Sequence, residues 1–356
     1  MIYYNSKNLI SPGIFDDLLS LKDLYISENN LTVLSKDIFS SLKELENLDL
    51  SSNKLQNLES GCFDNLSQLD SLDIANNALT TLSRGVFNDL EFLLDLDLSS
   101  NKLHKLESGC FNGLSKLVEL KIDNNGLTTL SKGVFINLEN LSTLILDSNN
   151  LQNLESGCFD GLSQLDLLSV KNNSLTTLAE SVFDGLENLR ELNINSNNLH
   201  NLQLRWFNDL SQLEKLNISN NSLTTLPEGV FNRLENLESL YLDSNKLQNL
   251  KSGCFDGLKK LELLSIKDNS LTSLSKDIFI SLENLETLEL ESNKLQNLES
   301  GCFNGLSKIE RLDISNHSLT TLSKGVFDGL KSLKVLELDS NKLQNLEPGC
   351  FDGLKT

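Results

Sequence analysis

Residue types that carry chemistry or interrupt a fold are scarce in this chain of 356 residues, which has 3 His, 3 Pro, 1 Trp and 1 Met. Basic residues are also in the minority, with 30 Lys and Arg against 50 Asp and Glu. No apolar run reaches the length of about 18 residues that a membrane-spanning helix needs. The chain does not begin with a basic segment followed by an apolar stretch, so no signal peptide is expected.

The net charge of −20 argues against two classes of partner. Nucleic acids and anionic membranes attract proteins with a basic face, because such a face neutralises the phosphate charges. We therefore expect no nucleic-acid binding and no direct insertion of this chain into a membrane.

What the sequence has in abundance is one unit of 24 residues, which recurs fourteen times from Leu21 to Thr356 without insertion or deletion. A fixed period of this length indicates a solenoid. Leucines at the first, fourth and sixth places of each unit alternate as in a short strand, so stacked units would form a parallel sheet. Residues 1–20 hold a partial unit, carried by Ile2, Asn5, Ile10, Phe15 and Leu18. We predict one array, residues 21–356, with no linker.

Two more columns recur with the same period. An Asn column runs from Asn29 to Asn341 and is interrupted only by His317. Its side-chain amide can donate to and accept from buried backbone groups of neighbouring turns. For His317 two interpretations stay open, a substitution that keeps one or two of these hydrogen bonds and a pH-sensitive joint. A Phe column from Phe39 to Phe351 should fill the space behind the sheet, and only Phe92 lies outside it.

The repeat resembles the leucine-rich repeat family in its 24-residue extracellular form, as in Leu69-x-x-Leu72-x-Ile74-x-x-Asn77-x-Leu79-x-x-Leu82. Residues 226–231 and 236–242 are similar to ectodomain repeats of Toll-like receptors, of Slit-type and chaoptin-type adhesion proteins, and of variable lymphocyte receptors. The resemblance implies an α/β solenoid, a horseshoe with a concave parallel β-sheet and a convex side of short helical or irregular turns. It also implies a protein-binding receptor ectodomain in innate immunity or cell adhesion, outside the cell or at its surface.

Extracellular relatives usually carry Cys-rich caps, which this chain does not show. We expect either a segment of a longer protein or a complete chain without caps. The missing leader and unpaired thiols support a second hypothesis, a cytoplasmic adaptor for protein interactions. A third hypothesis is the sensor part of a receptor whose signalling or catalytic domain lies outside this chain.

Cysteine occurs six times, each time directly before the Phe of an even-numbered unit, at Cys62, Cys110, Cys158, Cys254, Cys302 and Cys350. Odd-numbered units have Val or Ile there, so Cys serves as a small buried hydrophobe. The nearest cysteines are two turns apart, roughly 10 Å by strand spacing, which exceeds the limit of about 7 Å for a disulfide. We predict six free, buried thiols and no metal site.

Motifs of catalysis are missing. The sequence has no Gly-rich phosphate loop, no G-x-S-x-G and no H-E-x-x-H. His104 and His200 lie four units apart, roughly 20 Å by strand spacing, and cannot act together. Carboxylates on an open sheet have nothing to separate their pKa values as acid–base catalysis requires. We predict no enzyme activity and no cofactor.

Acidic residues gather on the predicted concave strands of the first six units, where Lys121 is the lone basic residue. The strip comprises Asp23, Glu28, Asp49, Asp73, Asp95, Asp97, Glu119, Asp123 and Asp147. It is either a solvated face or a docking surface for a protein ligand with a basic surface. Of these residues, Asp95, Asp97, Asp123 and Asp147 are taken as candidate ligand contacts.

Apolar side chains interrupt the polar concave face at two equivalent places, Ile145 with Leu167 and Tyr241 with Leu263. Each pair should lie diagonally on adjacent strands and anchor a protein ligand, unless the two pairs are one duplicated accident. On the convex side, Arg205 and Trp206 stand where even-numbered neighbours have Gly and Cys. An exposed pair of this kind would suit a binding hot spot; a drifted unit is the alternative. The oligomeric state is not indicated by the sequence.

Overall fold

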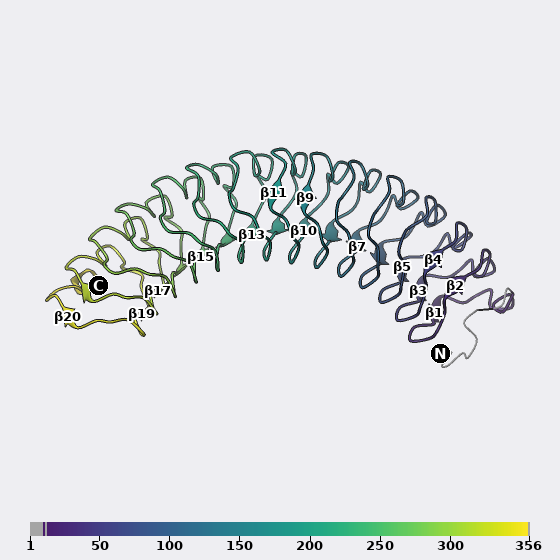
Figure 1. The fold of residues 1–356 in the computed structure, drawn as a ribbon, viewed down its shortest axis with the longest axis horizontal. Coiled ribbons are helices and arrows are strands. Elements are labelled where there is room, and N and C mark those ends of the chain that lie inside the picture. Colours follow the sequence, from purple (N-terminus) through teal and green to yellow (C-terminus); the bar gives the residue numbers. More distant parts are fainter. Residues whose placement is uncertain (1–9, 11–12, 355–356) are drawn as a thin grey trace. The chain divides into compact units, whose positions relative to one another are not determined.

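The computed structural model describes residue 10 and residues 13–354 and shows short strands and turns wound into a coil (Figure 1). The chain divides into two compact units, Met1–Leu186 and Glu187–Thr356. Of the partial repeat predicted in residues 1–20, Ile2 and Asn5 lie outside the described residues. Ile10 and Phe15 are buried, as the repeat pattern predicts, while Leu18 is exposed.

Seven parallel strands form the sheet of the first unit, and successive strands are paired in register at a spacing of 24 residues. They are β1 (Asp23–Tyr25), β3 (Asn47–Asp49), β5 (Ser71–Asp73), β6 (Asp95–Asp97), β7 (Glu119–Lys121), β8 (Thr143–Ile145) and β10 (Leu167–Ser169). Two pairs of two-residue strands also occur in this unit, β2 (Val33–Leu34) with β4 (Asn57–Leu58) and β9 (Asn153–Leu154) with β11 (Thr177–Leu178).

The second unit repeats this arrangement with seven strands of its own. They are β12 (Glu191–Asn193), β13 (Lys215–Asn217), β14 (Ser239–Tyr241), β15 (Leu263–Ser265), β16 (Thr287–Glu289), β17 (Arg311–Asp313) and β19 (Val335–Glu337). One short pair follows, β18 (Thr321–Leu322) with β20 (Asn345–Leu346), and then the 3₁₀ turn η1 (Asp352–Leu354).

The predicted solenoid of stacked coils is therefore confirmed in both units. Of the two possibilities for the side away from the strands, irregular turns are observed, since the described part of the chain contains η1 as its one helical element. The strands of the two sheets are three residues long, and the central residue of each is a leucine that points inward. In β5, Leu72 is 1% exposed between the outward-facing Ser71 and Asp73. Burial of one such leucine contributes about 1.5–3 kcal/mol, and the same contact recurs in every turn.

The Asn column forms the expected ladder. The Asn53 amide nitrogen donates to the carbonyl oxygens of Ile26, one turn back, at 2.9 Å and of Leu50 at 3.0 Å. Its carbonyl oxygen accepts from the backbone N–H of Leu31 at 3.0 Å. The residue before it, Ser52, has a φ of 55°, a left-handed conformation that short polar side chains tolerate better than branched ones. The sharp turn after each strand is thus stabilised from both neighbouring turns.

The Phe column stacks through the core of each unit, for example Phe39 on Phe63 with ring centroids 6.4 Å apart and planes 2° apart. The six cysteines are free and buried, as predicted. Burial raises the pKa of Cys62, Cys110, Cys158, Cys254 and Cys302 to about 12. Thiols with such pKa values are protonated at neutral pH and are poor nucleophiles.

His317 departs from the ladder in a way that the sequence did not predict. The side chain is 5% exposed, and neither Nδ1 nor Nε2 has a hydrogen-bond partner. The expectation that the imidazole keeps one or two of the lost hydrogen bonds is therefore wrong. Burial lowers the pKa of His317, an effect opposed by the nearby backbone of Asn293 and by the carboxylate of Asp313.

Candidate binding groove on the strand face

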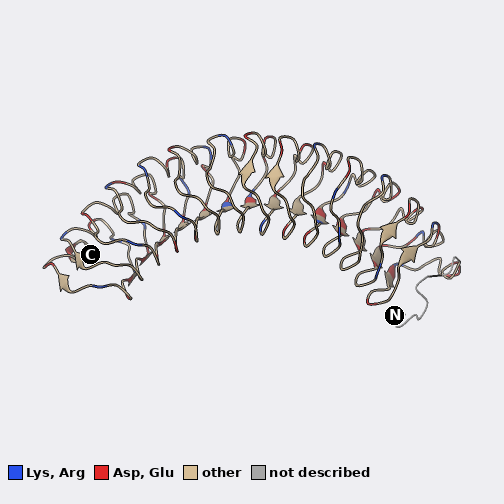
Figure 2. Ribbon diagram, viewed as in Figure 1, with Lys and Arg blue, Asp and Glu red and all other residues tan. Residues whose placement is uncertain are grey.

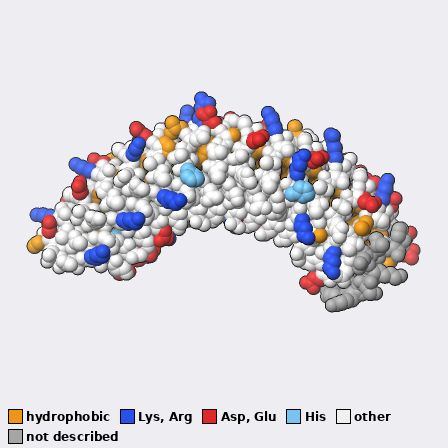
Figure 3. Space-filling view, in the orientation of Figure 1, with side chains coloured by type: hydrophobic (Ala, Val, Ile, Leu, Met, Phe, Trp, Pro, Cys, Tyr) orange, Lys and Arg blue, Asp and Glu red, His pale blue; other side chains and the backbone are white. Residues whose placement is uncertain are grey.

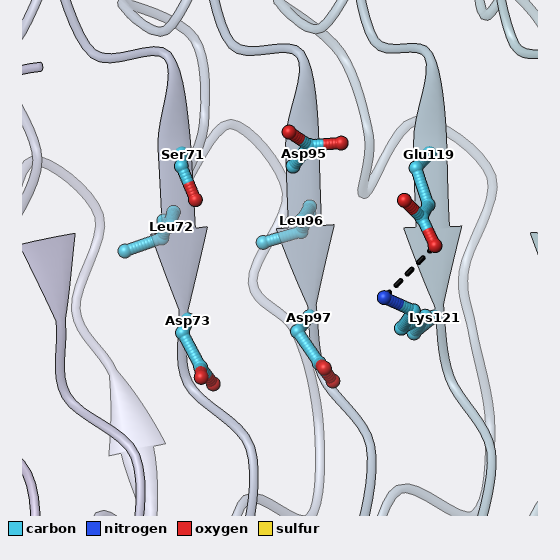
Figure 4. Close-up of a pocket in the computed structure, with 8 residues that line it drawn as sticks. All are labelled: Ser71, Leu72, Asp73, Asp95, Leu96, Asp97, Glu119 and Lys121. Carbon is cyan, nitrogen blue, oxygen red and sulfur yellow. Dashed lines mark ion pairs between the residues drawn. The ribbon is translucent and has the colours of Figure 1, made fainter. Parts of the chain in front are cut away.

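The outward side chains of β5, β6 and β7 line a hollow of about 300 Å³ on the strand face of the first unit. Four carboxylates border it, from Asp73, Asp95, Asp97 and Glu119, together with the ammonium group of Lys121 (Figure 4). A second hollow, of about 240 Å³, shares Ser71 and Asp73 with the first and extends to Tyr25 and Asp49. We call the two hollows together the acidic groove.

Register explains why the carboxylates gather. Asp49, Asp73 and Asp97 are direct neighbours on β3, β5 and β6, and adjacent strands lie only about 4.8 Å apart. Each carboxylate is oriented by an N–H two residues farther on, such as that of Ala75, which donates to Asp73 at 2.8 Å. Figure 2 shows acidic residues on strands along the inner edge of this unit. The groove is a row of aligned negative charges rather than a random cluster.

Burial and neighbouring carboxylates together raise the pKa of two aspartates of the groove. The pKa of Asp73 is raised by burial and further by the carboxylates of Asp97 and Asp49. The pKa of Asp95 is raised by burial and further by Glu119. A cationic group from a ligand would lower both pKa values by neutralising this repulsion. The groove is therefore suited electrostatically to a Lys or Arg side chain.

Lys121 is the one cation that lines the first hollow. Its ammonium group forms an ion pair with Glu119 at 2.8 Å, shown dashed in Figure 4. This pair raises the pKa of Lys121, and the negative charges of Asp97 and Asp95 raise it further. One lysine against four carboxylates leaves most of the negative charge uncompensated. On the face drawn in Figure 3, Lys and Arg side chains are scattered rather than gathered in one basic patch.

The two predicted apolar pairs lie as the sequence suggested. Thr143 is opposite Leu167 and Ile145 is opposite Ser169, so Ile145 and Leu167 are diagonal neighbours on β8 and β10. In the second unit, Tyr241 on β14 and Leu263 on β15 repeat this relation. All four side chains are half-buried. They offer limited apolar surface within a polar face.

Asp147 differs from the expected outward-facing contact. It is 7% exposed, and one oxygen accepts from the Ser169 hydroxyl at 2.5 Å and from the Lys171 N–H at 3.0 Å. The ammonium group of Lys171 lies 3.3 Å from the other oxygen. These contacts hold Asp147 in the wall of the coil, so it is not available to a ligand.

Asp243 occupies the same place in the second unit and was missed. It accepts from the Ser265 hydroxyl at 2.5 Å and from the Lys267 N–H at 2.9 Å, and burial raises its pKa. A Ser-x-Lys sequence one turn later is the signal that identifies both aspartates. Asp123 is less enclosed than these two aspartates. It is half-buried, burial raises its pKa, and it accepts a hydrogen bond from the Asn124 amide at 2.6 Å.

The convex candidate pair is corrected by burial. Trp206 is 2% exposed and packs edge-on against Phe207, with ring centroids 6.4 Å apart, so it offers no surface to a partner. The position before the column Phe faces the core in every turn, and the indole follows the same direction as Cys and Val. Its Nε1 has no hydrogen-bond partner. Arg205 is exposed, but without an exposed Trp beside it the expected hot spot is not formed.

Metal and membrane sites were also considered over the described residues. No group of three or more His, Cys, Asp or Glu among them could hold a metal ion. In the same part of the chain, no helix has both the length and the apolar character to cross a bilayer.

Comparisons with known proteins match the whole length of the chain to the family model described as leucine rich repeat. The matching segments are residues 1–55, 43–103, 93–151, 139–199, 187–247, 235–295, 260–318, 283–343 and 307–356. No curated protein matches the chain.

Similar folds occur among solved structures. A chain of the glycosylated Toll–Spatzle complex of Drosophila is 26% identical, with a TM-score of 0.87, over 93% of this chain and 46% of that chain. The chain thus spans just under half the length of that neighbour. A leucine-rich repeat protein of Leptospira interrogans is 31% identical, with a TM-score of 0.72, over 96% of this chain and 78% of its own. A chain of the TLR13–ssRNA13 complex shares the fold at 23% identity, with a TM-score of 0.70, over 96% of this chain and 67% of its own.

Proposed function

Because the chain belongs to the leucine-rich repeat family, we propose that it is a non-enzymatic scaffold that binds a protein ligand with a basic surface in the acidic groove. The observation that carries the proposal is the row formed by Asp49, Asp73 and Asp97, which faces outward from strands whose central leucines point inward. The pKa of Asp73 is raised by burial and, in addition, by repulsion from the carboxylates of Asp97 and Asp49. A basic ligand would convert that repulsion into attraction.

The role of a receptor-ectodomain-like segment is supported by the neighbours. Toll forms a complex with the protein Spatzle, and that complex is a molecular hub in Drosophila development and innate immunity. TLR13 forms a complex with single-stranded RNA, so the fold also accommodates an acidic ligand. The net charge of −20 favours a basic protein over RNA for this chain. We extend the proposal to innate immunity or cell adhesion, outside the cell or at its surface.

The proposal is tested with a fluorescent lysine-rich peptide of about ten residues, whose binding to the full chain is followed by anisotropy at physiological ionic strength. The groove variant D73N/D95N/D97N/E119Q removes four charges from the hollow. A control variant, E59Q/E91Q/E107Q/E155Q, removes the same number from glutamates that are exposed outside the sheet. We expect the groove variant to weaken binding about tenfold or more and the control to leave it nearly unchanged. Equal losses in the two variants would show that only net charge matters and would overturn the proposal.

A further inference from the structure

Three exposed apolar side chains occur just before two strands that line the acidic groove, β6 and β7, at positions where other turns are polar. Phe92, Leu94 and Val118 are 42%, 39% and 41% exposed. At the place of Leu94 and Val118, eleven of the fourteen units carry a charged residue, and at the place of Phe92 no other unit has an aromatic one. We call these three side chains the apolar flank.

In some other turns, the residue at the position of Leu94 forms an ion pair with the equivalent residue of the neighbouring turn. The ammonium group of Lys22 lies 2.5 Å from a carboxylate oxygen of Glu46, and that of Lys334 lies 2.6 Å from Glu310. Leu94 and Val118 are adjacent in the same column, and their backbones are joined by a hydrogen bond of 2.8 Å. Two adjacent exposed apolar groups in a column that is otherwise mostly charged do not help solubility, so they point to a surface that is covered by another molecule.

The flank and the groove are continuous along the chain. Leu94 immediately precedes Asp95 on β6, and Val118 immediately precedes Glu119 on β7. At about 3.3 Å per residue, Leu94 is roughly 10 Å from Asp97 along the strand. Apolar surface at one end and carboxylates at the other therefore fall within the reach of a few residues of an extended segment.

We propose that the apolar flank and the acidic groove together bind one extended segment of a partner protein, in which an apolar side chain lies two or three residues from a Lys or Arg. The apolar side chain covers Leu94 and Val118 beside the Phe92 ring, and the basic side chain enters the row of Asp73, Asp95 and Asp97. This inference rests on the proposed function and specifies its partner. Charge complementarity with the groove favours a basic segment, and the position of the flank determines the spacing between its apolar residue and its basic residue.

Phe92 is held in place for this role by a neighbouring turn. The ammonium group of Lys116 lies 3.7 Å from the centroid of the Phe92 ring. A cation over one face restricts the ring, which reduces the side-chain entropy lost when a ligand binds the remaining surface. Lys116 also places a positive charge against Phe92, so the basic residue of the ligand is directed toward the groove rather than toward the flank.

The test is a selection of random twelve-residue peptides displayed on phage against the full chain. Three variants serve as counter-targets, namely the flank variant F92S/L94Q/V118Q, the groove variant D73N/D95N/D97N/E119Q, and the control variant L18Q/L19Q/I136Q. The control removes three other exposed apolar side chains from the same unit. Thermal unfolding of each variant verifies that it is folded before binding is compared.

We expect the enriched peptides to carry an apolar residue two or three positions from Lys or Arg, to lose about tenfold or more in affinity for the flank variant, and to bind the control variant as before. Basic peptides that need the groove but bind the flank variant with full affinity would overturn this inference and leave the proposed function standing. No enrichment, or peptides that are indifferent to the groove variant, would overturn both.

Discussion

Replacing His317 with Asn should stabilise the last turns of the second unit. In the next turn, the Asn341 amide donates to the carbonyl oxygens of Ile314 at 2.9 Å and Leu338 at 3.0 Å and accepts from the Leu319 N–H at 3.2 Å. None of the equivalent contacts of His317 reaches hydrogen-bond geometry, although the ring is buried and the backbones of Asn293 and Leu290 are near enough to raise its pKa. Leaving a buried polar group unsatisfied costs about 1–3 kcal/mol. We expect H317N to recover a stabilisation of about that size.

The pH dependence gives the same substitution a second readout. Burial holds the pKa of His317 in the folded protein below its value of about 6.5 in the unfolded chain. The unfolded state therefore binds more protons than the folded state just below pH 6.5. The contribution of the neutral imidazole to the free energy of unfolding is therefore fully present above that pH and is lost as the pH falls through the lowered pKa of the folded state. H317N should lack this loss, whereas H104N, which removes an exposed imidazole, should retain it.

Hydrogen exchange resolved by peptide is the appropriate assay, because repeat proteins open locally and a single melting temperature averages over turns. Peptides from residues 290–345 should exchange more slowly in H317N, and the difference should grow from pH 7 to pH 5.5 after correction for intrinsic exchange. The reverse change, N293H, should accelerate exchange in the turn around it. If H317N and the wild type exchanged alike over this range, the argument from unsatisfied ring nitrogens would be refuted.

Three other outcomes are expected. Gly113 and Gly185 occupy the same position of their units, with φ of +99° and +81°. A Cβ at Gly113 would overlap the carbonyl oxygen of Phe87, whereas a Cβ at Gly185 would meet nothing within 4 Å, so G113A should lower the denaturation midpoint more than G185A. Thiol labelling at pH 7.5 should modify no cysteine rapidly in the native protein and all six after denaturation; a fast native reaction would contradict their burial. Because the pKa values of Asp73 and Asp95 are raised, affinity for a lysine-rich peptide should be full at neutral pH and fall as the pH drops through these values, and D73N/D95N should show a weaker pH dependence.

The repeat made the core predictable. Leu72, Asn53 and Phe63 lie where the period places them, because every turn meets the same neighbours and any departure would disturb two contacts. The thiol prediction held for the same reason, since Cys62 shares its slot with the valines of odd-numbered units. Trp206 was misassigned because the size of its side chain was weighed above its slot, which faces the core in every turn.

The surface was less predictable, because burial there depends on the residue one turn away. Asp147 has the composition of an exposed contact, and only Ser169 and Lys171 of the following turn decide that it is enclosed. Phe92, Leu94 and Val118 were missed since their slots lie just before the strand, outside the alternation that identifies outward side chains. Comparing each residue with the residues about 24 positions before and after it would have identified both the enclosed aspartate and the three apolar side chains.

Residues common to every turn cannot by themselves define a binding site in a repeat protein, because stacking requires them in turns that bind nothing. Specificity must come from positions that differ between turns. In the first unit these differences coincide, since the apolar flank and the carboxylates of Asp95 and Glu119 occupy the same two turns. Independent drift has no physical reason to place an exposed apolar group directly before each of two acids of the groove. One ligand that contacts both surfaces accounts for the coincidence.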